Sequence, residues 1–281
     1  MNIIILGNSK SVVSFINGLK VNKNQKISII SYKKKCRPNN SIELKKMFKN
    51  KYNCIKIENI NSIKVAKFIK SFKTDIIVSF WNKILNKKII DLPRLGVIGS
   101  HPTPLPYNRG RHPLHWLLSL GIKNSAISFF SMDKKIDNGK IIKQYKYKIH
   151  NKMNIQQLES SINTIIKKNS QNIIDRFSSL NSKLKKQNLK NANYLRKRNF
   201  SDLCINLKMN FVSINNLVKS FTIPYDCAFI LLENKIIRIK SVKKYKSKKL
   251  DTIEIGKILK ITEEYILTRC NDSIIKLYFK N

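Results

Sequence analysis

Short apolar runs alternate with amphipathic stretches through the first half of the chain. Residues 2–6 (NIIIL) end at Gly7, and apolar positions then recur at helical spacing as far as Leu19. This succession of strand, turn and helix predicts an α/β fold, doubly wound around a mostly parallel sheet. Further strands are predicted at residues 27–31, 75–80 and 95–98, and a further helix at residues 63–72.

The pattern changes after residue 150. A long amphipathic helix is predicted over residues 154–177, after strands at 127–132 and 141–149. The polar, lysine-rich segment 179–193 is predicted to be a connector, which divides the chain into domains at 1–190 and 191–281. Five short strands in the second domain predict a small, partly open barrel of the OB type. They span residues 229–232, 236–242, 256–261, 265–269 and 273–279.

Residues 95–142 are rich in proline, which restricts the backbone, and in glycine, which widens its range of conformations. Four of the seven prolines fall between Pro102 and Pro113, and this stretch holds five of the eight glycines. The alternating prolines of residues 101–106 exclude a helix or a central strand. We therefore predict that a strand ends at His101 and runs into a rigid, exposed loop. The carboxyl end of such a sheet is where α/β proteins bind ligands.

This stretch resembles the catalytic region of the folate-dependent formyltransferases. That family includes methionyl-tRNA formyltransferase, glycinamide ribonucleotide formyltransferase and amino-sugar N-formyltransferases. Residues 101–106 (HPTPLP) are similar to the family's Asn-x-His-Pro-Ser-Leu-Leu-Pro block, Arg109-Gly110 to its Arg-Gly, and residues 136–139 (IDNG) to its Leu-Asp-x-Gly-Asp. The resemblance covers nearly the whole chain. It implies a formyltransferase-like variant of the Rossmann fold, with His101 and Asp137 as the catalytic pair.

The resemblance also implies the binding residues. In the family, backbone near an Ile-Leu pair holds the pterin of the folate, although core packing is an equally open interpretation of that pair here. The residues implied for the folate are Trp81, Ile84, Leu85 and Asp133. Those implied for the substrate are Ser100, Asn108, Arg109 and Gly110, and no metal is implied. For His112 and His115 we expect structural packing or a surface position.

Formyl transfer from 10-formyltetrahydrofolate is the attack of a neutral amine on a formyl carbon. A catalyst must stabilise the oxyanion that develops and remove a proton from the amine. An imidazole that is held by a carboxylate does both in turn. His101 and Asp137 follow adjacent predicted strands, so we expect them at one edge of the sheet.

Gly99 departs from the family pattern, because it replaces the Asn whose amide would help bind the formyl oxygen. Three explanations are open. Ser100, Asn108 or Asn138 supplies the missing donor, backbone N–H groups supply it, or the chain is a degraded or redirected relative.

The formal net charge of +40 has two interpretations. Drift toward the A/T-rich codons of lysine, asparagine and isoleucine would spread lysine along the chain, as is observed. A functional surface that faces a polyanion is the alternative. The five cysteines are scattered without metal-ligand spacing, which indicates reduced thiols. With no apolar run of roughly 18 residues and no basic segment before the first apolar run, we expect a cytoplasmic location and no membrane partner.

Residues 110–116 (GRHPLHW) resemble the amino-sugar enzymes more than the tRNA enzymes. We therefore expect an N-formyltransferase that takes its formyl group from 10-formyltetrahydrofolate. Its expected acceptor is the amine of a nucleotide-linked amino sugar. One alternative is a methionyl-tRNA formyltransferase with tRNA as a partner, and another is a non-catalytic polyanion-binding relative. A homodimer remains open.

Overall fold

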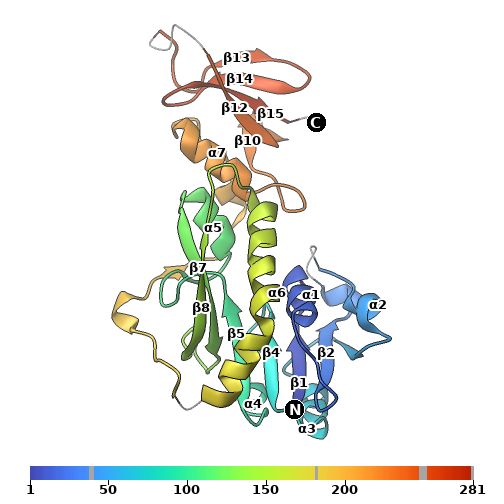
Figure 1. The fold of residues 1–281 in the computed structure, drawn as a ribbon. Helices are drawn as coiled ribbons and strands as arrows, with labels where there is room; N and C mark the ends of the chain where they lie inside the picture. The colour runs from blue at the N-terminus through green and yellow to red at the C-terminus, as the bar shows by residue number, and fades with distance from the viewer. Residues whose placement is uncertain (38–40, 181–182, 247–251, 280–281) are drawn as a thin grey trace. The chain divides into compact units, whose positions relative to one another are not determined.

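The computed structural model describes residues 1–37, 41–180, 183–246 and 252–279 (Figure 1). Its contacts divide the chain into two compact units. The first is Met1–Gly110, Ser125–Tyr147 and Ser160–Tyr194, and the second is Arg111–Asn124, Lys148–Glu159 and Leu195–Asn281. The chain thus passes between the units repeatedly, where the sequence suggests one boundary near residue 190.

A seven-stranded sheet forms the centre of the first unit, in the order β3-β2-β1-β4-β5-β7-β8. The first five strands in the chain are parallel, which confirms the α/β class and the mostly parallel sheet. β7 pairs antiparallel with β5. The strands are β1 (Asn2–Leu6), β2 (Lys26–Tyr32), β3 (Asn53–Ile57), β4 (Ile76–Ser79), β5 (Gly96–His101), β7 (Asn124–Ser131) and β8 (Ile141–Lys148).

Both faces of the central strands are buried. Ile4 and Leu6 of β1 pack in one cluster with Val65 of α3 and Ile89 of α4, while the alternate residue Ile5 is also fully buried. Strands covered on both faces become continuous apolar runs, as residues 3–6 and 76–78 are in the sequence. The helices are α1 (Lys10–Asn17), α2 (Leu44–Phe48), α3 (Ile63–Ser71), α4 (Lys87–Ile90) and α6 (Ile155–Leu180), with a 3-10 turn η1 (Lys34–Cys36).

The proline loop after β5 is buried at alternate residues and half-buried at its prolines, so the expectation of an exposed loop is wrong for residues 101–106. Thr103 is 0% exposed and Leu105 is 4% exposed. The Leu105 N–H donates to Ser128 Oγ at 3.1 Å, and that hydroxyl donates to Thr103 O at 2.6 Å. Because the side chain of a β7 serine satisfies its backbone groups, the loop packs against the sheet without losing hydrogen bonds.

The segment expected to be a plain connector is tied to the sheet and the site. Residues 181–182 lie outside the described ranges, and we call residues 183–194 the connector. The N–H of Ile141 at the start of β8 donates to Lys185 O at 2.8 Å. The connector includes a 3-10 turn η3 (Leu189–Asn191), and β9 (Tyr194–Leu195) forms a two-stranded sheet with β6 (Arg109–Gly110).

The second unit is rich in β-structure with antiparallel sheets, as expected for the C-terminal region. One predicted strand, 236–242, is two strands in separate sheets. Ile239 N bonds to Ala228 O, whereas Lys240 N bonds to Tyr278 O, so the chain changes sheet between these two residues. The sheets are β10-β11 and β12-β15-β14-β13. The elements are α5 (Pro113–Ser119), η4 (Phe200–Leu203), α7 (Phe211–Ser220), β10 (Phe229–Leu232), β11 (Lys235–Arg238), β12 (Ser241–Tyr245), β13 (Ile258–Ile261), β14 (Tyr265–Arg269) and β15 (Ile274–Tyr278).

His115 of α5 has the structural role that we expected. Its ring stacks on Phe221 with centroids 4.7 Å apart and meets the edge of Tyr225 at 4.8 Å. Its Nδ1 lies 2.6 Å from Ser220 O. Burial lowers the pKa of His115 to about 4. In the described part of the chain, no helix is both long and apolar enough to cross a membrane.

This histidine should make the stability of the protein depend on pH. Between about pH 4 and pH 6.5 the unfolded chain binds a proton at His115 that the folded chain does not, so the free energy of unfolding rises with pH across that range. In a His115→Gln variant, the gain in unfolding free energy from pH 4 to pH 7 should be smaller by about 3 kcal/mol. Urea unfolding at four pH values measures it, and parallel curves for the two proteins would contradict it.

Candidate active site

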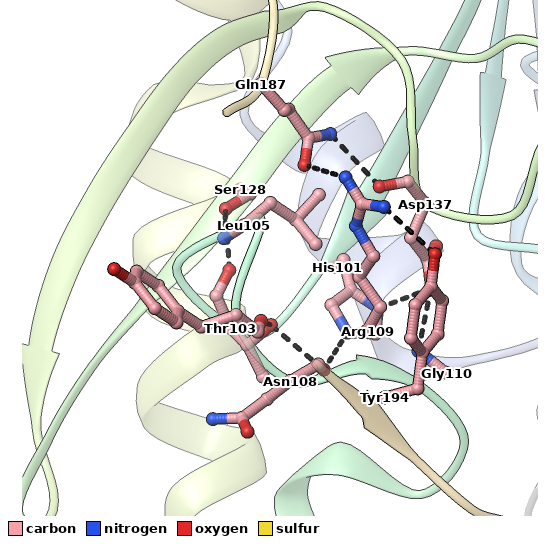
Figure 2. A network of polar contacts seen from close by, with 11 residues as sticks. His101, Thr103, Leu105, Asn108, Arg109, Gly110, Ser128, Asp137, Gln187 and Tyr194 are labelled. Atoms are coloured by element: carbon pink, nitrogen blue, oxygen red, sulfur yellow. Dashed lines mark hydrogen bonds and ion pairs between the residues drawn. The ribbon is translucent and has the colours of Figure 1, made fainter. Parts of the chain in front are cut away.

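His101 is the last residue of β5, and its side chain faces one backbone carbonyl and one carboxylate (Figure 2). Its Nε2 lies 2.8 Å from Asn108 O. Its Nδ1 lies 3.6 Å from Asp137 Oδ2, just beyond direct hydrogen-bond length. Because His101 is only 5% exposed, protein groups surround the imidazole on most sides.

The carbonyl of Asn108 determines which nitrogen of His101 is basic. A carbonyl oxygen only accepts hydrogen bonds, so Nε2 carries a proton in the neutral ring and Nδ1 carries the lone pair. The same carbonyl also accepts from Thr103 Oγ1 at 3.2 Å, and Asn108 itself has φ +56. The loop thus aims the basic nitrogen at Asp137.

Asp137 lies in the loop between β7 and β8, at φ +50. Its Oδ2 accepts from Gly110 N at 3.0 Å. The expected proximity of His101 and Asp137 is confirmed, but the reason we gave for it is wrong. Because β7 is antiparallel to β5, Ser131 at the end of β7 pairs with Ile98 and not with His101. Asp137 reaches His101 because the loop turns back along β5.

Gly99 is a glycine because of close packing and not because of its φ angle, which is not in the left-handed region. A Cβ at this position would lie 2.7 Å from Phe130 Cζ and 2.8 Å from Met132 Cγ. One of the three side chains that we considered as substitute donors, Asn138, already donates to Asp133 Oδ2 at 3.1 Å. Asn108 accepts at Oδ1 from Asn193 Nδ2, which leaves its own Nδ2 to donate, and Ser100 directly precedes His101 in β5.

Restoring asparagine at Gly99 should therefore destabilise the protein without raising its rate. Overpacking of this kind costs about 1–3 kcal/mol. A Gly99→Asn variant should lose that much unfolding free energy in urea, and a Gly99→Asn/Phe130→Leu double variant should recover part of it because the ring atoms are gone. A Gly99→Asn protein of unchanged stability and raised activity would show that the space is open.

The residues implied for the folate lie in two loops. Trp81 stacks on Tyr32 with centroids 3.9 Å apart, and its Nε1 is buried without a partner among the described residues. Ile84 is 65% exposed. Leu85 is 3% exposed and belongs to the hydrophobic core, so the side chain of Leu85 has the core-packing role that we left open for this pair. Asp133 accepts from Lys135 N at 2.8 Å.

Arg109, implied for the substrate, is 1% exposed. Its Nη1 donates to Tyr194 Oη at 3.0 Å and its Nη2 to Gln187 Oε1 at 2.7 Å. The guanidinium is therefore enclosed by the connector. Sequence reasoning missed Gln187 and Asn193, because a polar, lysine-rich segment gives no sign of which residues turn inward.

Metal ligands do not gather at this site. Within the described ranges, no group of three or more His, Cys, Asp or Glu side chains is placed to hold a metal ion.

The comparisons with known proteins agree with the fold and the motifs. The sequence profile described as "Formyl transferase" matches residues 1–174, and the one described as "Formyl transferase, C-terminal domain" matches residues 199–278. The chain therefore belongs to the formyl transferase family.

Three relatives illustrate the match. The chain is 33% identical to the bifunctional polymyxin resistance protein ArnA of Wigglesworthia glossinidia brevipalpis, over 73% of this chain and 32% of ArnA. It is 29% identical to methionyl-tRNA formyltransferase of Thermotoga maritima, over 59% of this chain and 54% of that protein. The chain thus spans about a third to a half of these curated relatives. The structure resembles an N-formyltransferase of Helicobacter canadensis with a TM-score of 0.70 at 18% identity, covering 98% of each chain.

Proposed function

We propose that this protein is a folate-dependent N-formyltransferase, with the chemistry in the first unit. One observation carries the proposal. In a chain of this family, the basic nitrogen of a buried histidine faces a carboxylate at 3.6 Å, and a backbone carbonyl fixes the ring from its other side. This is an arrangement for moving one proton and stabilising the resulting charge.

Each protein group has one task in the proposed reaction. The acceptor amine attacks the formyl carbon of 10-formyltetrahydrofolate. The bond from that carbon to N10 then breaks, and the leaving tetrahydrofolate nitrogen receives the proton that His101 took from the amine. His101 takes up at Nδ1 the proton that the amine must lose, and Asn108 O keeps Nε2–H in place. The Asp137 carboxylate stabilises the imidazolium that forms. Gly110 N–H holds that carboxylate at 3.0 Å.

The loops after β4 and β7 fit a folate. Trp81 and Met132 both pack against the cluster that contains Leu85, so the two loops lie along one apolar surface. The buried Nε1 of Trp81 is a donor with no partner among the described residues. A pterin ring, which carries hydrogen-bond acceptors, would supply that partner. We assign the pterin to the backbone of residues 81–85 and the loop of residues 131–139.

We assign the acceptor to the nucleotide-linked amino sugars. The similar Helicobacter canadensis structure is described as a complex with folinic acid and dTDP-3-aminofucose. Residues 110–116 resemble the amino-sugar enzymes as well. Formylation of methionyl-tRNA is the second candidate, which the Thermotoga maritima relative and the net charge of +40 favour.

An acceptor screen tests these assignments. The protein is incubated with 10-formyltetrahydrofolate and either nucleotide-linked amino sugars or methionyl-tRNA, and release of tetrahydrofolate is followed. Transfer to an amino sugar and not to methionyl-tRNA is expected. Transfer to methionyl-tRNA alone would replace the first acceptor by the second. Transfer to no amine, with folate binding also absent, would reject the enzyme and leave a non-catalytic relative.

A further inference from the structure

The connector contacts both halves of the catalytic pair. Asn193 contacts Asn108, whose carbonyl holds His101. Gln187 contacts the loop that carries Asp137 (Figure 2). These contacts join residues 50 to 85 positions apart in the chain.

On the Asp137 side, the connector is bonded to the loop through the side-chain amide of Gln187. Gln187 Nε2 donates to Asp137 O at 3.0 Å and to Gly139 O at 2.7 Å. Its Oε1 accepts from Arg109 Nη2 at 2.7 Å. A guanidinium only donates and a carbonyl only accepts, so the side chain between them must do both. Glutamine does so and glutamate does not.

On the His101 side, the contact is a pair of amides. Asn193 Oδ1 accepts from Asn108 N at 2.7 Å, and Asn193 Nδ2 donates to Asn108 Oδ1 at 2.8 Å. The N–H of Arg109 donates to Asn193 O at 3.0 Å. The peptide that fixes the ring of His101 is thereby held from the connector.

The residues held in this way have an unfavourable backbone conformation. Asn108 has φ +56 and Asp137 has φ +50. Residues other than glycine adopt such angles where surrounding bonds impose them, and sites of chemistry are common examples. The bonds of Gln187 to the Asp137 and Gly139 carbonyls are such bonds.

We propose that Gln187 is a positioning residue for formyl transfer, which sets the Asp137 carboxylate opposite His101. The proposal rests on the formyl transfer proposed above. The side-chain bonds of Gln187 go to two backbone carbonyls and to Arg109, and not to the His101 ring or the Asp137 carboxylate. Gln187 acts through the peptides of Asp137 and Gly139, and Arg109 holds its own oxygen in place.

A Gln187→Glu variant distinguishes a loss of positioning from a loss of folding. It keeps an acceptor for Arg109 and adds a charge that the buried guanidinium favours, so the fold is retained. It loses both N–H donors and turns an oxygen toward two carbonyls. A Gln187→Glu variant should therefore unfold at the same urea concentration as the natural protein, while kcat falls by about 10- to 100-fold because the pair is misplaced. KM for each substrate should change by less than about threefold.

A second measurement does not depend on activity. Gly110 N–H donates to Asp137 Oδ2, so its hydrogen exchange reports where that carboxylate lies. In Gln187→Glu this amide should exchange faster by about tenfold or more, without a loss of global protection. The matched control is Gln157→Glu, because Gln157 is exposed and its Oε1 only accepts from Asn154 N. That variant should match the natural protein in rate and in Gly110 exchange.

Two results would overturn the proposal. One is a Gln187→Glu protein with natural kcat and natural protection of Gly110. The other is a rate lost only in proportion to the folded fraction, in this variant and in Gln187→Leu. If the natural protein transfers formyl to no amine, the proposed function fails, and Gly110 exchange alone decides whether Gln187 positions Asp137.

Discussion

A His101→Gln variant should remain folded and lose formyl transfer by about 10²- to 10⁴-fold, the usual contribution of a positioned acid or base. Glutamine keeps an amide N–H for Asn108 O, which accepts from Nε2 at 2.8 Å, but has no nitrogen that takes up a proton. Single-turnover rates of formyl transfer at pH 7 give the size of the loss, and circular dichroism shows whether the fold is retained.

The exposed histidine of the same chain provides the control. His150 lies after β8 and no side-chain bond of its ring joins it to the site residues described above. His150→Gln should leave the rate unchanged. If His101→Gln kept more than about a tenth of the natural rate, another group would be the base, and our assignment of Nδ1 would be wrong.

An Asp137→Asn variant should lose activity on a similar scale, about 10²- to 10⁴-fold, although its side chain has the same shape. The amide keeps an oxygen for Gly110 N, so the loop is retained. The same atom, Oδ2, also lies 3.6 Å from His101 Nδ1, so the amide places an uncharged oxygen there and the negative charge that stabilises the imidazolium is gone.

Two measurements test the Asp137→Asn variant. They are kcat at saturating 10-formyltetrahydrofolate and the urea concentration at the midpoint of unfolding. Asp91→Asn is the control, because Asp91 is exposed and paired with Lys87 on α4. Asp137→Asn with a rate near that of Asp91→Asn would show that the carboxylate only supports the loop. A large loss in both proteins would point to general charge effects.

The parallel half of the sheet could be predicted because burial on two faces leaves a local signature. The apolar runs of residues 3–6 and 76–78 lie in β1 and β4. The direction of β7 could not be predicted, because an apolar run such as residues 127–132 has the same pattern whichever way it points. Its antiparallel pairing with β5 depends on contacts distant in sequence.

At the site, the motif predicted the pair but not what holds it. His101 and Asp137 stand in recognisable sequence contexts. Gln187 and Asn193 stand in a run of lysine and asparagine where the composition indicates only a solvated segment. The steric cause of Gly99 was also hidden, because it depends on Phe130 and Met132 of the neighbouring strand and loop. Long-range packing determines both features, and a single sequence does not display it.

The bonds between the connector and the loops that carry Asn108 and Asp137 have a consequence during synthesis on the ribosome. A nascent chain that has reached Phe177 already contains His101 and Asp137, but Gln187 and Asn193 are still to be added. The bonded partners are 48 to 85 positions apart, and all of that chain must be made before these loops can close. Maturation of the site is thus tied to the last part of the first unit to leave the ribosome, and not to the completion of its parallel strands.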